Sequence, residues 1–302
     1  KMENADFPAR LDTSDEWIRS HTGIASRFIA DETDSASSLA VAACREAMGA
    51  VNAADIDLIV CATATPDYCG FPSVACLVQR ALGAQNAACF DVSAACSGFL
   101  YALDTAAALM ERHKSRFALV CAAEVLSRIV DWNDRATCVL FGDGAGAVVL
   151  GAADEPGIIH GKLQADGNYL DLLNVPGQIA NGQICGTPYI KMDGPGVFKF
   201  AVKMLAKVAE EVIREAGMTP DQVDWLVPHQ ANKRIIESTA KHLGLGMEKV
   251  ILTVQDHGNT SAASIPLALD AGIQSGQIQR GHNLLLEGIG GGFAWGAVLL
   301  KY

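Results

Sequence analysis

The chain has 302 residues, of which 50% are hydrophobic and 19% charged, and its formal net charge is −11 at pH 7. This length suffices for one large domain or two integrated ones, and the acidic balance argues against bulk binding of nucleic acid. The closest approach to a membrane span, residues 288–300, is too short and too rich in glycine. Nine cysteines without a C-x-x-C pair fit neither a disulfide framework nor a zinc cluster, which predicts reduced thiols in the cytoplasm.

Taken in chain order, apolar runs indicate strands and periodic segments indicate helices. Residues 56–63 and 117–123 are continuous apolar runs, as expected of buried strands, and a helix-like segment lies between them at 100–110. Between residues 198 and 216, apolar side chains recur every three or four positions, which predicts a helix closed by Gly217. This alternation predicts an α/β architecture.

Three short patterns occur twice in the same order, which indicates an internal duplication. They are residues 57–61 and 224–228, residues 102–104 and 268–270, and the glycine-rich residues 142–150 and 290–300. We therefore expect two similar α/β halves, residues 1–155 and 156–302, that pack with helices between them. Loops at equivalent strand ends then meet near the middle and bring Cys96 of the first half to His229 and Asn259 of the second.

Cys96 lies in the stretch DVSAACSGF, residues 91–99, at the start of a helix-like segment. A helix N-terminus stabilises the thiolate, which is the nucleophilic form of cysteine, and the small neighbouring residues leave room for a substrate. The alternative is an inert buried cysteine, because free cysteine is among the most buried residue types. Local sequence leaves both open for Cys96, whereas six other cysteines are predicted to be structural: Cys44, Cys61, Cys76, Cys89, Cys121 and Cys138.

The second half offers polar residues in equivalent loops. His229 follows a strand-like run and opens a helix, which suits either a cleft histidine or a satisfied structural one. Asn259 lies in a turn rich in Gly, Ser and Thr, where asparagine commonly caps or turns the chain. The triplet Gly290–Gly292 either brings backbone N–H groups close to a substrate carbonyl or only makes a tight turn.

Several motifs together resemble the condensing enzymes of the thiolase fold, and among them the β-ketoacyl-acyl-carrier-protein synthase III family. They are DTSDEWI (12–18), FPS (71–73), AACSGF (94–99), FGDGAGAVVL (141–150), VPHQAN (227–232), HGNTSAAS (257–264) and GGGFAWG (290–296). The resemblance covers essentially the whole chain. It implies a thiolase-like fold in α-β-α-β-α layers, and catalytic roles for Cys96, His229 and Asn259.

The resemblance also implies a reaction in two halves. Cys96 takes an acetyl group from acetyl-CoA, and malonyl-acyl-carrier-protein then loses carbon dioxide and condenses with that group to give acetoacetyl-acyl-carrier-protein. His229 and Asn259 are expected to donate hydrogen bonds to the enolate formed by decarboxylation. The backbone N–H groups of Cys96 and Gly291 form the expected oxyanion hole. No metal or cofactor is expected, because decarboxylation itself generates the nucleophile.

The expected CoA site has one departure from the family pattern. Trp17 is expected to stack on adenine with Arg135 on the other face, although an ordinary packed aromatic is the alternative for Trp17. Asn232 is expected to contact the pantetheine arm. The family commonly has RTGI after DEWI, where this chain has His21 in place of the arginine that helps to bind CoA phosphates. Because histidine is mostly neutral at pH 7, CoA binding is expected to be weaker or more dependent on pH.

Two further surfaces are implied by the resemblance. Phe71 is expected to reach across a homodimer interface to the acyl pocket of the other subunit. An acidic carrier protein needs a basic patch on this acidic chain, and Lys199, Arg234 and Lys241 are the expected contacts. An ordinary solvated helix face is the alternative for this patch.

The first strand typical of the family is expected to be missing before residues 4–6, through truncation of the chain. Related Cys-His-Asn synthases of secondary or signalling metabolites remain an alternative, as does a catalytically silent protein that binds acyl-CoA or carrier protein. Thiolases fit less well, because GIGGGFAWG lacks their second catalytic cysteine.

Overall fold

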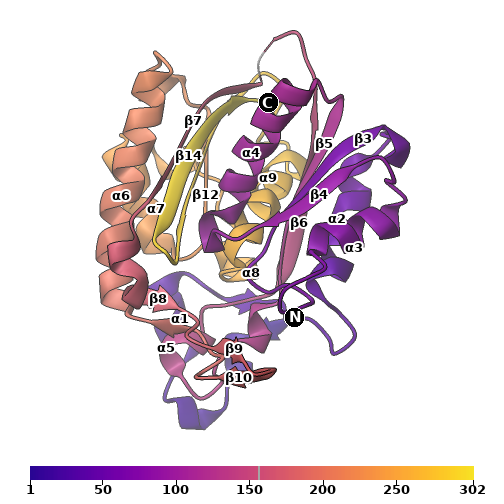
Figure 1. The fold of residues 1–302 in the computed structure, drawn as a ribbon. Helices are drawn as coiled ribbons and strands as arrows, with labels where there is room; N and C mark the ends of the chain where they lie inside the picture. Colours follow the sequence, from indigo (N-terminus) through magenta and orange to yellow (C-terminus); the bar gives the residue numbers. More distant parts are fainter. Residues whose placement is uncertain (156) are drawn as a thin grey trace.

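The computed structural model describes residues 1–155 and 157–302. Two mixed sheets are separated by one layer of helices and covered on their outer faces by two more, which confirms the predicted α-β-α-β-α layers (Figure 1). The predicted boundary between the halves falls at residues 155 and 156, and residue 156 lies outside the described residues.

The first sheet has the order β4-β3-β5-β6. Strand β3 is parallel to β4 and to β5, and β6 returns antiparallel to β5. Both apolar runs expected to be buried strands are found here. The bounds are β3 (Ile56–Ala62), β4 (Ala88–Val92), β5 (Phe117–Glu124) and β6 (Gly144–Gly151).

The second sheet repeats this plan in the order β12-β13-β14-β7. Strand β12 is parallel to β13, and β14 is antiparallel to both β13 and β7. The equivalents of β3, β5 and β6 are therefore β12, β13 and β14. The bounds are β7 (Ile158–Ala165), β12 (Trp225–Pro228), β13 (Asn283–Gly290) and β14 (Ala294–Lys301).

The two sheets differ at both edges, and within the described residues no counterpart of β4 pairs with β12. Strand β7 covers the outer edge of β14, whereas within residues 1–155 and 157–302 no strand pairs with the equivalent edge of β6. The chain begins with β1 (Met2–Glu3), which pairs with β2 (Ser26–Arg27) outside both sheets. The predicted absence of a family strand stays a prediction.

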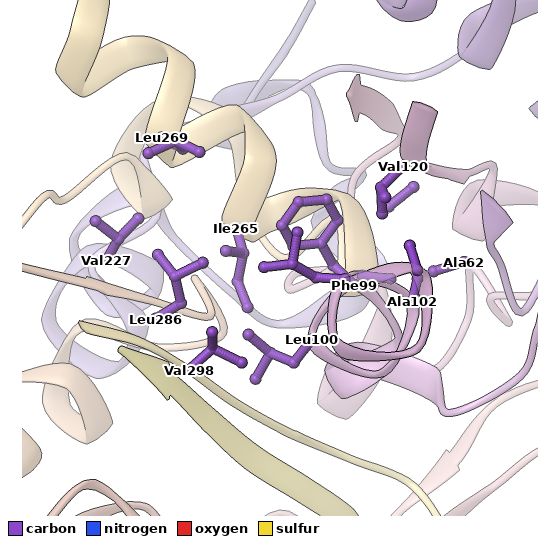
Figure 2. Packing of buried hydrophobic residues seen from close by; sticks show 14 of the residues in the cluster. Ala62, Phe99, Leu100, Ala102, Val120, Val227, Ile265, Leu269, Leu286 and Val298 are labelled. Atoms are coloured by element: carbon purple, nitrogen blue, oxygen red, sulfur yellow. The ribbon is translucent and has the colours of Figure 1, made fainter. Parts of the chain in front are cut away.

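The central layer consists of α4 (Gly98–His113) and α9 (Ser264–Gln274), which pack against both sheets (Figure 1). Figure 2 shows Phe99 and Leu100 of α4 near Ile265 of α9, with Leu286 of the second sheet and Val120 of the first beside them. All five side chains are fully buried. This core fixes the N-termini of α4 and α9 relative to each other.

Two helices cover each outer face. They are α2 (Ala36–Met48) and α3 (Val74–Leu82) on the first sheet, and α6 (Gly194–Glu215) and α7 (Lys233–His242) on the second. Helix α6 begins four residues before the predicted helix, because Asp193 caps it and accepts a hydrogen bond from Gly196 N–H at 3.2 Å. The apolar stripe predicted between 198 and 216 faces the sheet, with its middle part buried and Phe198, Val202 and Ala216 partly buried.

Shorter elements gather at one end of the molecule (Figure 1). They are α1 (Asp15–Thr22), α5 (Arg135–Cys138), α8 (Val254–His257), β8 (Leu173–Asn174), β9 (Gln178–Ala180), β10 (Gln183–Cys185) and β11 (Lys191–Met192). None of the described helices combines the length and apolar character that crossing a membrane requires.

Candidate active site

Cys96 lies in a short 3-10 turn, Ala95–Ser97, that runs directly into α4. Ala95 adopts a left-handed conformation with φ of 44°, and the Cys96 side chain is buried, with 6% exposed. Burial raises the pKa of the Cys96 thiol to about 12, although the nearby Ser261 hydroxyl lowers it. The helix start is where the sequence predicted it, but desolvation outweighs its effect on the thiolate, so the free site holds a thiol.

The end of β13 approaches the Cys96 turn too closely for side chains. A Cβ on Gly290 would lie 2.4 Å from the Cys96 backbone nitrogen. A Cβ on Gly288 would lie 3.5 Å from both the Cys96 carbonyl oxygen and the His229 Cβ. Gly288 and Gly290 therefore let the Cys96 turn and His229 lie close to the end of β13. A Cβ on Gly291 would lie 2.6 Å from the Leu173 carbonyl oxygen, and the part of Gly291 in the oxyanion hole stays a prediction.

His229 follows β12 and is buried, with 6% exposed. Its Nδ1 lies 2.6 Å from the hydroxyl oxygen of Ser264, the first residue of α9, and that oxygen also accepts a hydrogen bond from Gln230 N–H at 3.2 Å. Burial lowers the pKa of His229 to about 4, so its imidazole is neutral at pH 7. With Ser264 donating to Nδ1, the proton of the neutral ring lies on Nε2.

Asn259 is anchored on three sides in the loop before α9. Its backbone N–H donates to the Leu140 carbonyl at 2.9 Å, and its own carbonyl accepts from Gly142 N–H at 3.0 Å. The side-chain Oδ1 accepts from Ser261 N–H at 2.9 Å. Asn259 therefore has the turn-forming role that the sequence offered as an alternative. Its side-chain Nδ2 is still available as a hydrogen-bond donor. Asn259 is 7% exposed.

These contacts bring the three predicted residues together. The Cys96 backbone and the His229 Cβ both lie beside Gly288, and Ser261 connects the Cys96 thiol to Asn259. The result is a buried thiol beside two neutral groups that can donate hydrogen bonds. This combination suits capture of an acyl group followed by stabilisation of a developing enolate.

Trp17, His21 and Arg135 form one cluster at the surface. The rings of Trp17 and His21 stack with centroids 4.4 Å apart, and the Arg135 guanidinium lies 4.9 Å from the Trp17 ring centroid. Arg135 also donates to the Asp12 carbonyl at 2.7 Å. Because Arg135 rests directly on Trp17, an adenine ring can enter between them only if the arginine moves outward.

Asn232 lies next to this surface cluster, at the start of α7. It caps α7, with Oδ1 accepting from Arg234 N–H at 2.9 Å, and its Nδ2 donates to the His21 carbonyl at 3.1 Å. A Cβ on Gly23 would lie 2.6 Å from the Lys233 Cβ, so α1 and α7 are tightly joined. The packing of α1 against α7 therefore brings together three predicted CoA contacts, Trp17, His21 and Asn232.

Phe71 stands apart from these residues. Its side chain is 89% exposed, so within one chain it lines no buried pocket. Tyr68, in the same loop, is 51% exposed. A large exposed aromatic residue of this kind commonly marks a contact surface.

The basic residues of α6 and α7, which include the three predicted carrier-protein contacts, divide into paired and unpaired ones. Lys207, Arg214 and Lys233 each lie within 4 Å of a glutamate, at 3.8, 3.6 and 3.6 Å. By contrast, Lys199, Lys203, Arg234 and Lys241 are exposed and make no ion pair within the described part of the chain. Arg234 lies over the Phe198 ring at 5.6 Å, which brings the starts of α6 and α7 together. No group of three or more His, Cys, Asp or Glu side chains among residues 1–155 and 157–302 is arranged to hold a metal.

Sequence patterns missed several residues that shape the site. Ser264 and Ser261 were visible only as members of the motif HGNTSAAS, and Glu124 was not singled out, because it directly follows the apolar run 117–123. Glu124 is fully buried, and burial raises the pKa of its carboxyl to about 7. The signal that could have found it is a carboxylate inside a run otherwise typical of a buried strand.

Comparison with known proteins gives consistent relationships. Two family models, both described as 3-oxoacyl-[acyl-carrier-protein] synthase III, match residues 90–167 and 213–302, the latter being the C-terminal model. A β-ketoacyl-[acyl-carrier-protein] synthase III of Neisseria gonorrhoeae is 68% identical over 305 residues, covering 100% of this chain and 95% of the relative. One from Neisseria meningitidis is 67% identical with the same coverage.

Solved structures agree in fold. The 3-oxoacyl-[acyl-carrier-protein] synthase III of Aquifex aeolicus superposes with a TM-score of 0.94 at 45% identity, covering 100% of this chain and 95% of that one. A priming β-ketosynthase from a polyketide biosynthetic pathway gives 0.92 at 37% identity, covering 99% and 91%. The fold and the relatives define a condensing enzyme of the acyltransferase type. The chain belongs to the β-ketoacyl-acyl-carrier-protein synthase III family.

Proposed function

We propose that this chain starts fatty acid synthesis by condensing an acetyl group with malonyl-acyl-carrier-protein. The observation that carries the proposal is the convergence of the Cys96 thiol, the neutral His229 ring and the free amide of Asn259 around Gly288 and Ser261. This arrangement provides a nucleophile and two hydrogen-bond donors in a buried place.

In the first half-reaction, Cys96 attacks the thioester carbonyl of acetyl-CoA. The Cys96 S–C bond forms, the bond from the carbonyl to the CoA sulfur breaks, and the thiol proton leaves with CoA. The backbone N–H groups of Cys96 and Gly291 are the proposed donors to the oxyanion of the tetrahedral intermediate. Because the pKa of the Cys96 thiol is raised, proton removal accompanies the attack rather than preceding it.

In the second half-reaction, malonyl-acyl-carrier-protein loses carbon dioxide as the bond to its carboxylate carbon breaks. The electron pair forms an enolate, whose oxygen accepts hydrogen bonds from His229 Nε2 and Asn259 Nδ2. Each such donor contributes ~3 kcal/mol in a preorganised dry site. The enolate carbon bonds to the acetyl carbonyl, the C–S bond to Cys96 breaks, and the released thiolate takes up a proton. The product is acetoacetyl-acyl-carrier-protein.

Binding surfaces are assigned in the same proposal. Trp17, His21, Arg135 and Asn232 are assigned to CoA, and Lys199, Arg234 and Lys241 to the acidic carrier protein. Phe71 is assigned to a homodimer contact that completes the acyl pocket of the other subunit, as its 89% exposure supports. The nine free cysteines support a location in the cytoplasm.

The test is intact mass spectrometry after incubation with acetyl-CoA, with the added group mapped by peptide. We expect one acetyl group on Cys96, removed when malonyl-acyl-carrier-protein is added, with acetoacetyl-acyl-carrier-protein as product. Acylation only by a different primer would favour a related synthase of secondary or signalling metabolites. If no acyl-CoA acylates the protein although CoA still binds, the protein is a binding protein and not an enzyme.

A further inference from the structure

Gln230 directly follows His229 in the chain, and its side chain is buried, with 1% exposed. A side-chain amide has two N–H donors and two acceptor positions on its oxygen, and in Gln230 all four are used. The partners are backbone groups: the carbonyl oxygens of Pro228 and Ile251, which accept from Nε2 at 2.9 and 3.0 Å, and the N–H groups of Thr253 and Val254, which donate to Oε1 at 2.9 and 3.0 Å. A buried amide satisfied in this way holds its partners in one arrangement.

The Gln230 side chain connects two segments that end at the active site. Pro228 is the last residue of β12, and the chain passes directly from it to His229. The other three partners lie in the segment 251–254, which leads through α8 to Asn259. The amide therefore binds the strand end before one proposed donor and the segment before the other.

The hydrogen bonds continue along α8 to Asn259. Thr253 and Val254 stand at the start of this short helix, where backbone N–H groups lack partners within the helix, and Gln230 Oε1 accepts from both. The Val254 carbonyl in turn accepts from Gly258 N–H at 3.0 Å. Gly258 directly precedes Asn259, so a shift at the start of α8 is passed to the backbone of Asn259.

The backbones of the two donors are anchored to different halves of the molecule. His229 N–H donates to the Glu287 carbonyl of β13 at 2.7 Å, in the second sheet. Asn259 is bound through its backbone to Leu140 and Gly142, which precede β6 of the first half. A side chain that joins the end of β12 to the start of α8 therefore controls how far apart the donors lie.

The backbone of Gln230 also acts on the His229 ring. Gln230 N–H donates to the Ser264 oxygen at 3.2 Å, and that oxygen lies 2.6 Å from His229 Nδ1. Because an N–H already donates to this oxygen, the hydroxyl proton is directed to Nδ1, which leaves the ring proton on Nε2. The backbone and the side chain of Gln230 thus bear on both donors.

We propose that Gln230 is a positioning residue, whose side-chain amide sets the separation between His229 Nε2 and Asn259 Nδ2. The two donors must reach one enolate oxygen together, and an error of about 1 Å in such an arrangement can lower a rate roughly 100-fold. Gln230 itself touches no substrate in this arrangement. The roles of His229 and Asn259 rest on the proposed function.

The two half-reactions are expected to respond differently to changes at Gln230. Acylation uses the Cys96 thiol and the backbone N–H groups of the proposed oxyanion hole, and none of the four partners of the Gln230 amide belongs to the Cys96 turn. Condensation needs both side-chain donors in place. A variant that was only less stable would impair both half-reactions by the same factor.

The test compares Gln230→Glu and Gln230→Met with the unaltered protein. A glutamate still accepts from the two N–H groups, but its carboxylate has no hydrogen to donate to the two carbonyls. A methionine has a similar length and makes none of the four bonds. Val78→Ala is the matched control, because Val78 is fully buried in α3 of the first half, and its truncation lowers stability without touching these contacts.

Acylation is timed by mass with acetyl-CoA, and condensation in single turnover, by adding malonyl-acyl-carrier-protein to enzyme already acetylated. For both Gln230 variants we expect condensation to slow at least about tenfold more than acylation, with an unchanged KM for malonyl-acyl-carrier-protein. Val78→Ala should slow the two half-reactions equally or not at all. A difference of less than about tenfold between the half-reactions in both Gln230 variants, or the same difference in V78A, would overturn the inference.

A second measurement separates this inference from the proposed function. Protein labelled with ¹⁵N-asparagine gives an Asn259 side-chain amide signal, assigned by its loss in Asn259→Asp. We expect that signal to shift in both Gln230 variants and to stay in place in Val78→Ala, whether or not acetyl-CoA acylates the protein. An unmoved signal in both Gln230 variants would refute the positioning role, whereas absent acylation of the unaltered protein would refute the proposed function alone.

Discussion

The hydroxyl oxygen of Ser264 lies 2.6 Å from Nδ1 of His229, and the two residues come from different elements, the start of α9 and the loop after β12. This bond occupies Nδ1 and leaves Nε2 as the ring nitrogen proposed to donate to the enolate. It is also a product of the duplication, because the counterparts of His229 and Ser264 are Ala62 and Gly98, which pack with the two Cβ positions 3.1 Å apart. The close contact between Ala62 and Gly98 in the first half thus corresponds to the polar contact between His229 and Ser264 in the second.

Replacing Ser264 with alanine is expected to lower the rate of the condensation step. Without the hydroxyl, Nδ1 has no partner and the ring can rotate or carry its proton on the wrong nitrogen. We expect the rate to fall about 10- to 100-fold, with acylation of Cys96 much less affected. Single-turnover kinetics on the acetylated enzyme measures it, with Ser264→Thr as the variant that keeps the hydroxyl. An unchanged condensation rate in S264A would remove Ser264 from the positioning of His229.

The buried neutral His229 is expected to make the protein less stable in mild acid. Its pKa is lowered to about 4, while an unfolded histidine titrates near its ordinary value of about 6.5. Between those values the unfolded state binds the additional proton, so this contribution to stability is lost as pH falls from about 6.5 to 4 and amounts to ~3 kcal/mol.

Denaturant unfolding at pH 7 and pH 5 measures the effect, with His229→Gln as the comparison. We expect the unaltered protein to lose more unfolding free energy between these pH values than H229Q does. The buried carboxyls Glu124 and Glu287 act in the opposite direction, because their raised pKa values make stability fall as pH rises. Both proteins contain them, so their contribution cancels in the comparison, and equal losses would show that His229 is charged when folded.

A methyl group at Gly290 is expected to block acylation. Its Cβ would lie 2.4 Å from the Cys96 nitrogen and 3.0 Å from the Ala95 Cβ, so the strand or the turn must move and the Cys96 N–H is displaced from the oxyanion. We expect Gly290→Ala to slow acylation by at least about 100-fold. Gly276→Ala, at a position with open space but φ of 75°, controls for a backbone penalty alone. Acylation of G290A at the unaltered rate would contradict the predicted oxyanion hole.

Replacing His21 with arginine is expected to strengthen CoA binding. The histidine ring stacks on Trp17 and its Nδ1 lies 2.7 Å from the Trp17 carbonyl oxygen, so only Nε2 is left to reach a phosphate. A guanidinium is always charged and binds phosphate through two hydrogen bonds. We expect the KM for acetyl-CoA to fall a few-fold, and more at pH 8 than at pH 6. Identical KM values for both proteins at both pH values would refute the role of His21.

Reversing the charges of Lys199, Arg234 and Lys241 to glutamate is expected to raise the KM for malonyl-acyl-carrier-protein by at least about tenfold at low salt, with less effect at high salt. Acetylation of Cys96 by acetyl-CoA should be unchanged, because no carrier protein takes part. The matched control reverses Arg80, Arg112 and Lys114, three exposed residues of the first half that do not belong to α6 or α7. Equal KM values for the two triple variants would argue that the patch is an ordinary solvated face.

The buried strands and the two similar halves could be predicted from the sequence, because their patterns recur along the chain. Apolar runs predicted β3 and β5, and the three recurring patterns predicted the duplication, since burial of a strand leaves a continuous signal in the sequence. Cys96, His229 and Asn259 were found because they are chemically distinctive and lie in short specific motifs. Their convergence follows from equivalent strand ends in two packed halves.

The residues that sequence reasoning missed depend on close packing between distant segments. Ser264 is one serine among several, and only the position of α9 against the end of β12 joins it to His229. Glu124 lies in an apolar run, and its partners, Ala64 and Thr65, are about 60 residues away in the chain. The direction of the pKa change at Cys96 was also missed, because burial cannot be read from the neighbouring residues alone.

The raised pKa of Cys96 also bears on chemical damage. Peroxides and alkylating agents attack the thiolate, so a thiol with a pKa near 12 presents almost none of the reactive form to them at neutral pH. We therefore expect Cys96 to react slowly with general thiol reagents at neutral pH. A covalent inhibitor chosen only for general thiol reactivity would modify the exposed Cys69 and Cys185 first. A selective covalent inhibitor must carry a group that resembles the thioester substrate. It must also contain a base that can accept the proton of the Cys96 thiol.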